Sequence, residues 1–159
     1  AIEWEDDRQT LKPGVAPWID TPQIEAGLDH KSIKRWCWIW HDRDIYTEED
    51  EIADRTGRIK AGDRKFKHAH IVLEVPGKVP VSTIARWFKV PPQQVTILRG
   101  RGAFLDGSEY LVHESPRAVE QHKTHYDDDE VHTSPGFDFR KELTAYIFKD
   151  TEYIASFTT

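Results

Sequence analysis

At 159 residues and 18.5 kDa, with 38% hydrophobic and 31% charged residues, the chain is long enough to bury one hydrophobic core. No apolar run reaches the length needed to span a bilayer, and the single cysteine, Cys37, excludes an internal disulfide. We therefore expect one cytoplasmic domain over residues 1–159. Because the chain lacks methionine and begins at Ala1, we expect it to be a processed or truncated piece of a longer product.

The net charge of −6 is distributed unevenly along the chain. Residues 58–101 contain 10 basic and 2 acidic side chains, whereas residues 1–57 contain 7 and 14, and residues 102–159 contain 5 and 12. At first sight the negative net charge argues against nucleic-acid binding, because phosphate contacts usually need a basic surface. A basic centre between acidic flanks is compatible with a confined DNA track, and a solvated basic loop is the alternative.

Two elements are predicted in the first third of the chain. A short helix is expected within residues 18–30, with Thr21 as its cap and Pro22 in its first turn, after a polar, irregular segment over residues 1–16. Residues 35–41 (RWCWIWH) have largely apolar side chains on both faces, which predicts a central strand that is covered on both sides. The three tryptophans on one face are expected to pack in the core rather than to stack on bases.

Strands and helices alternate in the rest of the chain. After a polar excursion over residues 45–66, residues 67–75 (KHAHIVLEV) predict a second inner strand. The further predicted elements are an amphipathic helix over residues 81–90, a short strand over 94–98, a helix over 103–114 and a helix or strand–helix unit over 137–148. This order predicts an α+β sandwich, in which helices pack on an antiparallel sheet.

Histidines and carboxylates gather near the ends of the two apolar strands. His68 and His70 are two positions apart on a strand, so their imidazoles leave the same face. His41 ends the other strand and Asp44 follows three residues later, with Asp42 as the competing carboxylate. If the strands are neighbours, three imidazoles and one carboxylate meet there, a set that suits Mn²⁺, Mg²⁺ or Zn²⁺. Structural packing of the histidines is the alternative.

Tyr110 is the candidate nucleophile for such a metal site. On a helix, Tyr110, His113 and Glu114 would share one side. A neutral tyrosine hydroxyl is a poor nucleophile, and a divalent cation on the scissile phosphate would help by withdrawing charge and orienting the phosphate. A packing role is the alternative for Tyr110, and His113 either relays a proton or packs.

Together these segments resemble the HUH endonucleases, specifically the one-tyrosine plasmid initiators of the streptococcal rolling-circle type (the Rep_2, RepB-like family). Residues 41–44 (HDRD) are similar to the family's H-D-K-D block. Residues 67–73 (KHAHIVL) are similar to its histidine–hydrophobic–histidine strand, and residues 110–115 (YLVHES) to its Y-L-T-H-E-S nucleophile block. Residues 123–127 (KTHYD) and Phe137-Asp138 also resemble it. The resemblance covers about residues 35–140.

The resemblance implies a ferredoxin-like antiparallel sheet of about five strands with flanking helices. It implies His41, Asp44, His68 and His70 as ligands of Mn²⁺ or Mg²⁺, and Tyr110 as the nucleophile. The implied reaction is strand-specific nicking of single-stranded or hairpin origin DNA, which leaves the tyrosine joined to the 5′ end and a free 3′-OH. Host replication machinery is the further implied partner. The family's C-terminal oligomerisation region is expected to be absent from this chain, and the resemblance implies oligomerisation only for a full-length protein.

Several alternatives remain at this point. One is a metal-dependent phosphoesterase that uses an activated water and does not need Tyr110. Others are a non-catalytic DNA-binding module with a structural metal, and a relaxase or transposase of the same superfamily. Tyr126 is expected to be structural rather than a second nucleophile. The expected DNA contacts are basic residues and one aromatic that stacks on a base: Arg58, Lys60, Arg64, Lys65, Lys67, Arg86, Trp87, Lys89, Arg99 and Arg101.

Overall fold

The computed structural model describes residues 19–75, 79–98, 100 and 102–147. The elements are, in chain order, α2 (Thr21–Leu28), β1 (Arg35–His41), α3 (Glu48–Ala53), β2 (His68–Glu74), α4 (Val81–Phe88), the 3-10 helix η1 (Pro92–Gln94), α5 (Ala103–Leu111), α6 (Pro116–Glu120), the 3-10 helix η2 (Asp128–Glu130) and β3 (His132–Thr133), before a helix over residues 139–147. The predicted α+β class is confirmed. The segment over residues 1–16 lies outside the described residues.

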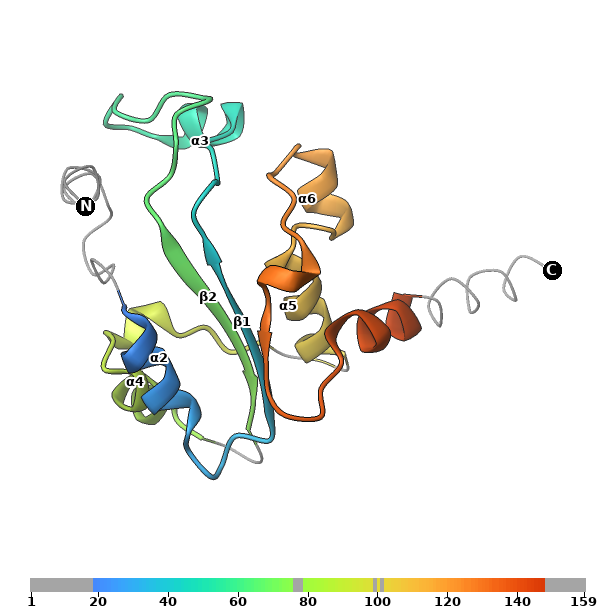
Figure 1. Cartoon of the computed structure of the whole chain (residues 1–159). Helices are drawn as coiled ribbons and strands as arrows, with labels where there is room; N and C mark the ends of the chain where they lie inside the picture. The colour runs from blue at the N-terminus through green and yellow to red at the C-terminus, as the bar shows by residue number, and fades with distance from the viewer. Residues whose placement is uncertain (1–18, 76–78, 99, 101, 148–159) are drawn as a thin grey trace.

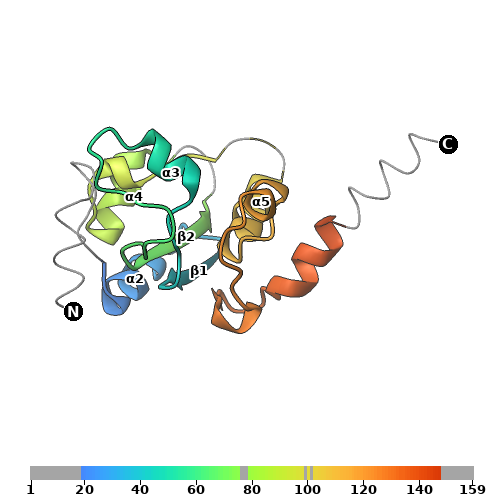
Figure 2. The ribbon, with the colours of Figure 1, turned by 90° about the horizontal axis from the view of Figure 1, so that it is seen from above.

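The described strands form one antiparallel sheet in the order β2-β1-β3. Figures 1 and 2 show α2 and α4 on one face of this sheet. They show α5 and the helix over residues 139–147 on the other face, with α3 beyond the end of the strands. β1 is therefore the central strand and is covered from both sides, as its two apolar faces predicted.

Apolar residues fill both faces of β1. Trp38 is buried on the face toward α2 and α4, where Trp36 and Trp40 pack against the same cluster. Cys37 and Ile39 are buried on the opposite face, in a cluster that includes residues of α5. The prediction that the tryptophans pack in the core is therefore confirmed.

The strand predicted over residues 94–98 is wrong. Pro92–Gln94 forms η1, and residues 95–98 have no regular structure. The preceding proline pair favours a turn over a ladder, because neither proline can donate a backbone hydrogen bond. Ile97 and Leu98 are 48% and 52% exposed, so this segment lacks the burial of an inner strand. The described residues form three strands, and the ferredoxin-like sheet of about five is not confirmed.

Two helix starts differ from the sequence prediction. Asp20, and not Thr21, caps α2, because its carboxylate accepts a hydrogen bond from the Gln23 N–H at 2.8 Å. α3 lies inside the excursion where no helix was predicted. Its start is a capping box between Thr47 and Asp50, and it has no buried residue. A helix without an apolar face carries no periodicity by which it could be recognised.

Gly107 allows α5 to lie close to β2. A Cβ at this position would lie 2.9 Å from a Leu98 methyl carbon and 3.2 Å from a Val72 methyl carbon. A larger residue would therefore push the helix away from the sheet. The glycine weakens the helix by its own propensity, but here it allows the middle of α5 to pack against β2, the strand that carries the histidine pair.

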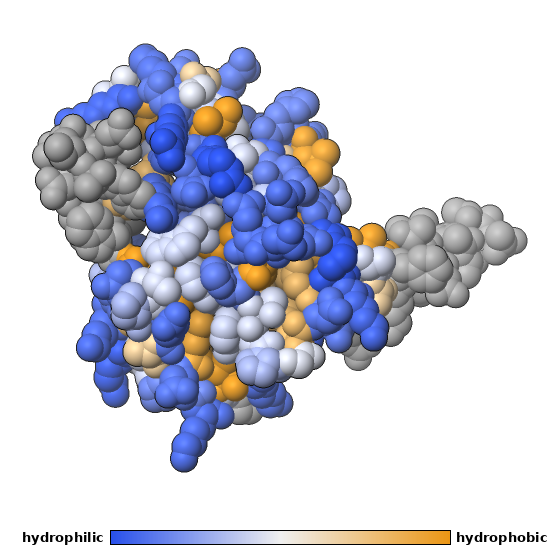
Figure 3. Space-filling model, viewed as in Figure 1, coloured by the Kyte–Doolittle hydropathy of each residue, from blue (hydrophilic) through white to orange (hydrophobic). Residues whose placement is uncertain are grey.

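The surface is mainly polar. Figure 3 shows hydrophilic residues over most of the face seen in Figure 1, with smaller apolar patches between them. Ile52 and Val119 are among the exposed large hydrophobic residues, and single apolar side chains are normal on protein surfaces. Within the described ranges, no helix combines the length and the apolar character that a membrane crossing requires.

Candidate metal centre

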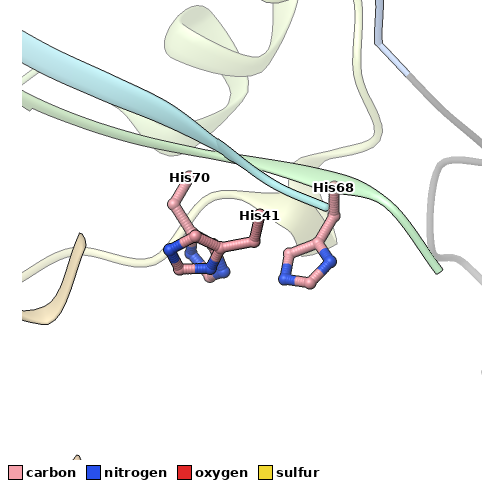
Figure 4. Close-up of side chains that lie close together, drawn as sticks. All are labelled: His41, His68 and His70. Carbon is pink, nitrogen blue, oxygen red and sulfur yellow. The ribbon is translucent and has the colours of Figure 1, made fainter. Parts of the chain in front are cut away.

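The register between β1 and β2 brings three histidines onto one face of the sheet. His41 lies opposite His68, and Ile39 lies opposite His70. Opposite residues of an antiparallel pair share a face, as do residues two positions apart on one strand. The His41 ring centroid lies 5.4 Å from that of His68 and 4.3 Å from that of His70. Figure 4 shows the three side chains projecting to the same side of the strands.

The loop after β1 turns back toward the start of β2. The Lys65 N–H donates to the Asp44 carbonyl oxygen at 2.7 Å. Ile45 and Arg64 form an antiparallel bridge, and the Arg64 guanidinium donates to the Asp42 carbonyl oxygen at 2.7 Å. These contacts between residues about 20 positions apart hold Asp44 beside the first residues of β2.

The Asp44 carboxylate lies among the histidines. Its Oδ2 atom is 3.3 Å from His41 Nδ1 and 3.5 Å from His68 Nε2. The Asp42 carboxylate instead accepts a hydrogen bond from the neighbouring Arg43 side chain at 3.0 Å, at the surface. Of the two candidate carboxylates, the structure therefore brings Asp44 into the cluster.

The ring nitrogens of the cluster are oriented by backbone carbonyl groups. Three rings donate one N–H each to a carbonyl oxygen: His41 Nε2 to Leu111, His68 Nδ1 to Phe66 and His113 Nδ1 to Thr124. A carbonyl oxygen only accepts, so the bonded nitrogen carries the proton and the other nitrogen of a neutral ring keeps a lone pair. Histidine ligands of metals are usually held in this way.

The donor set fits a divalent cation. Among the described residues, two buried side-chain nitrogen atoms have no hydrogen-bond partner, His41 Nδ1 and His113 Nε2. A lone pair on His41 Nδ1 facing the Asp44 carboxylate at 3.3 Å is unfavourable unless a positive charge lies between them. Metal–ligand bonds of about 2.0–2.2 Å place neighbouring ligand atoms about 3.0–3.5 Å apart. The two Asp44–histidine distances agree with that spacing.

Burial also sets the protonation states that a metal needs. It lowers the pKa of His68 and lowers that of His70 well below its ordinary value. Burial alone would raise the pKa of Asp44, but the electrostatic influence of the neighbouring His41 ring and the hydrogen bond from Tyr126 outweigh it, so the pKa of this carboxyl lies below its usual range. Neutral imidazoles beside a carboxylate are the forms that bind divalent cations.

Tyr110 lies in the last turn of α5, half-buried, beside the histidines. Its ring centroid is 5.5 Å from that of His70 and 5.1 Å from that of His113. Its hydroxyl oxygen accepts a hydrogen bond from Lys123 Nζ at 3.1 Å. Lys123 was not among the functional residues predicted from the sequence. Its position in the block over residues 123–127 was the available signal.

Tyr110, His113 and Glu114 were predicted to share one side of a helix, and this prediction is wrong for His113 and Glu114. α5 ends before them, and His113 has a left-handed backbone with φ of 60°. The turn nevertheless brings the His113 ring to a centroid distance of 4.6 Å from His41. The Glu114 carboxylate is bound by Arg140 at 2.7 Å and is not part of the cluster.

Tyr126 supports Asp44 from the protein interior. Its hydroxyl donates to Asp44 Oδ1 at 2.7 Å and accepts from the Arg43 N–H at 3.0 Å. The ring is fully buried and stacks on His41 with centroids 4.5 Å apart. Burial, then the hydrogen bond to Asp44, raises the pKa of Tyr126 far above its ordinary value. These contacts fit the expected structural role.

Replacing Tyr126 with phenylalanine is expected to lower the free energy of unfolding by about 1–3 kcal/mol, because an Asp44 oxygen and the Arg43 N–H lose their partner. Urea denaturation measures this loss. Tyr146→Phe is the matched control: the Tyr146 hydroxyl donates to Asp106 at the same 2.7 Å, but at the surface. Its cost should stay within about 0.5 kcal/mol. Equal losses in both variants would contradict the supporting role of Tyr126.

A groove of about 1250 Å³ runs along β2. Its lining includes Lys65, Lys67, His68 and His70, and it becomes apolar further along the strand, toward Leu73. The groove therefore connects Lys65 and Lys67, which belong to the basic part of the sequence, to two of the clustered histidines. A basic, partly apolar groove can accept both the phosphates and the bases of a single strand.

The other expected DNA contacts lie on different elements. Five of them are described and exposed, and they lie between β1 and β2 or at α4: Arg58, Lys60, Arg64, Arg86 and Lys89. The Trp87 ring is stacked on His30, with centroids 4.2 Å apart and an angle of 16°, so one of its faces is covered by the protein. Arg99 and Arg101 lie outside the described residues.

The fold and the site define an α+β domain that gathers histidines, a carboxylate and a tyrosine at one end of its sheet. The chain belongs to the family described as "Plasmid replication protein, origin binding domain", whose model matches residues 21–140. The prediction of a plasmid replication protein is thereby confirmed at the level of the family. The match also includes α2, which precedes the part of the chain covered by the resemblance in the sequence.

A curated relative agrees with this family. The chain is 34% identical over 132 residues to a "Replication protein" of Onion yellows phytoplasma (strain OY-M). The match covers 82% of this chain and 32% of the relative. The chain therefore spans about a third of the length of the curated relative that it matches.

Proposed function

We propose that this domain is a HUH endonuclease of the one-tyrosine type, which nicks plasmid origin DNA to start rolling-circle replication. The observation that carries the proposal is the position of Tyr110 beside a cluster that fits a divalent cation. A nucleophile next to a metal centre is the minimum that a metal-assisted transesterification of DNA needs. Membership in a family of origin-binding domains supplies the substrate class.

The proposed ligands are His41, His68, His70 and Asp44, with Mn²⁺ or Mg²⁺ as the expected ion. When bound, the ion would withdraw charge from the scissile phosphate and orient it. His113 is proposed as a proton relay, because its buried Nε2 has no hydrogen-bond partner and its ring lies beside Tyr110.

The reaction exchanges one phosphodiester for another. The Tyr110 oxygen attacks the phosphorus, the bond from phosphorus to the 3′ oxygen breaks, and the tyrosine becomes joined to the 5′ end. The phenol loses its proton and the 3′ oxygen gains one, which leaves a 3′-OH that can prime synthesis. Because the phosphodiester energy is kept in the phosphotyrosine bond, a later strand transfer can reseal the DNA.

The groove along β2 is the proposed path of the single strand toward the site, with Lys65 and Lys67 as phosphate contacts near the histidines. Contacts with the host replication machinery and oligomerisation are proposals for the full-length initiator.

A denaturing gel tests the proposal. Protein, Mn²⁺ and a panel of labelled single-stranded hairpins from the plasmid origin should give a covalent protein–DNA band and a 3′-OH that a polymerase extends. Chelation of the metal should remove both products. Binding without cutting would indicate a DNA-binding module, and cutting without the covalent band would indicate hydrolysis by water. Either result would contradict the proposal.

A further inference from the structure

Lys123 contacts the atom that would react. Its Nζ donates to the Tyr110 hydroxyl oxygen at 3.1 Å and lies 5.2 Å from the centroid of the tyrosine ring. The side chain is partly buried, and its backbone N–H is bonded to the Ala118 carbonyl oxygen of α6 at 3.0 Å. The ammonium is therefore held at the phenol by the chain that follows α6.

Tyr110 and Lys123 also line a polar cavity of about 390 Å³ together with residues of α3 and α6. The Gln121 amide donates to the Glu49 carboxylate at 2.9 Å and joins the two walls. Figure 1 shows α3 and α6 at the same end of the molecule. The Tyr110 ring therefore lies beside the histidines, while its hydroxyl is hydrogen-bonded to Lys123 in the lining of this cavity. A phosphate bound at the histidine cluster would lie next to the cavity.

The neighbouring charges leave the Lys123 ammonium directed at the phenol. Asp50 is an acidic residue in the lining of the cavity, and its carboxylate accepts a hydrogen bond from the Thr47 N–H at 2.8 Å. The same carboxylate lies 3.8 Å from Lys65 Nζ. Its charge is thus shared between the Lys65 and Lys123 ammonium groups, while the Lys123 ammonium donates a hydrogen bond to the Tyr110 oxygen.

We propose that Lys123 is a catalytic residue of the nicking reaction, an inference that rests on the function proposed above. Its ammonium stabilises the negative charge on the Tyr110 oxygen as the O–H bond breaks and the O–P bond forms. The phosphorus–3′-oxygen bond breaks and the 3′ oxygen takes up a proton, so Lys123 ends the reaction in its starting protonation state. In the reverse reaction, which reseals the strand, the same ammonium stabilises the departing phenolate.

Lys123→Met tests this role, because it removes the charge and keeps a side chain of similar length. With Mn²⁺ and a hairpin that wild type cuts, the single-turnover rate of adduct formation should fall about 100-fold, the usual size of one lost donor to a developing oxyanion. The Kd for the uncut hairpin, measured without metal, should stay close to that of wild type. Lys123→Arg should recover part of the rate, since a guanidinium also donates.

Lys141→Met is the matched control, because Lys141 is exposed on the helix over residues 139–147. It should change neither the rate nor the Kd. A second readout needs no DNA: the ¹³Cζ NMR resonance that disappears in Tyr110→Phe should shift in Lys123→Met and stay in place in Lys141→Met. This signal reports the contact between the ammonium and the phenol directly.

The possible failures are distinguishable. An unchanged rate in Lys123→Met, with an active wild type, overturns the role of Lys123 and leaves the proposed function standing. A Kd that rises in parallel with the fall in rate also overturns it, because Lys123 would then be an ordinary phosphate contact. If wild type forms no adduct with any hairpin, the proposed function fails and the role of Lys123 fails with it.

Discussion

Tyr110→Phe is expected to abolish the covalent protein–DNA adduct while the domain stays folded and still binds the hairpin. The variant removes one oxygen atom and keeps the ring, which packs beside His70 and His113. Loss of a nucleophile lowers the rate of a covalent mechanism by a factor on the order of 10⁴ or more. The measurement is a denaturing gel with Mn²⁺ and a labelled hairpin, quantified for the shifted band.

Tyr126→Phe is the matched control, since it removes the same atom from the second tyrosine in contact with the cluster. It should still form the adduct, because the Tyr126 hydroxyl is buried against Asp44 and does not face solvent. An adduct that survives in Tyr110→Phe and is lost in Tyr126→Phe would reverse the assignment of the nucleophile. Metal-dependent cutting by Tyr110→Phe without an adduct would instead indicate an activated water.

Asp44→Asn is expected to weaken Mn²⁺ binding by at least about 100-fold, because it removes the negative charge that lies among the neutral histidines. The asparagine oxygen can still accept the Tyr126 hydroxyl proton, so the local fold should persist. Isothermal titration calorimetry with Mn²⁺ measures the change in Kd, and thermal unfolding without metal checks that the domain is intact.

Asp42→Asn makes the same chemical change two residues away. Its carboxylate pairs with Arg43 at the surface and lies outside the cluster, so the affinity for Mn²⁺ should stay that of wild type. If Asp42→Asn loses Mn²⁺ and Asp44→Asn keeps it, the ligand assignment is reversed. If wild type binds no divalent cation, the histidines are packing residues and the metal centre is absent.

Part of this domain was determined by the sequence alone, because it depends on local periodicity. The apolar segments over residues 35–41 and 67–75 predicted two strands, and β1 and β2 fall within those bounds. The prediction that the second strand is an inner one is wrong for the described sheet, because β2 lies at its edge. The alternating direction of side chains along a strand placed His68 and His70 on one face. The helix α3 was not predicted, because it has no apolar face and therefore no local periodicity.

The composition of the site was decided by the tertiary structure. Local periodicity does not specify which residues of two strands lie opposite each other, and the register that sets His41 against His68 comes from backbone bonds between them. The choice of Asp44 over Asp42 depends on the loop that folds back onto the start of β2. The same holds for the left-handed turn at His113 and for the contact of Lys123 with Tyr110. No short sequence pattern predicts either of them, because both depend on packing between distant residues.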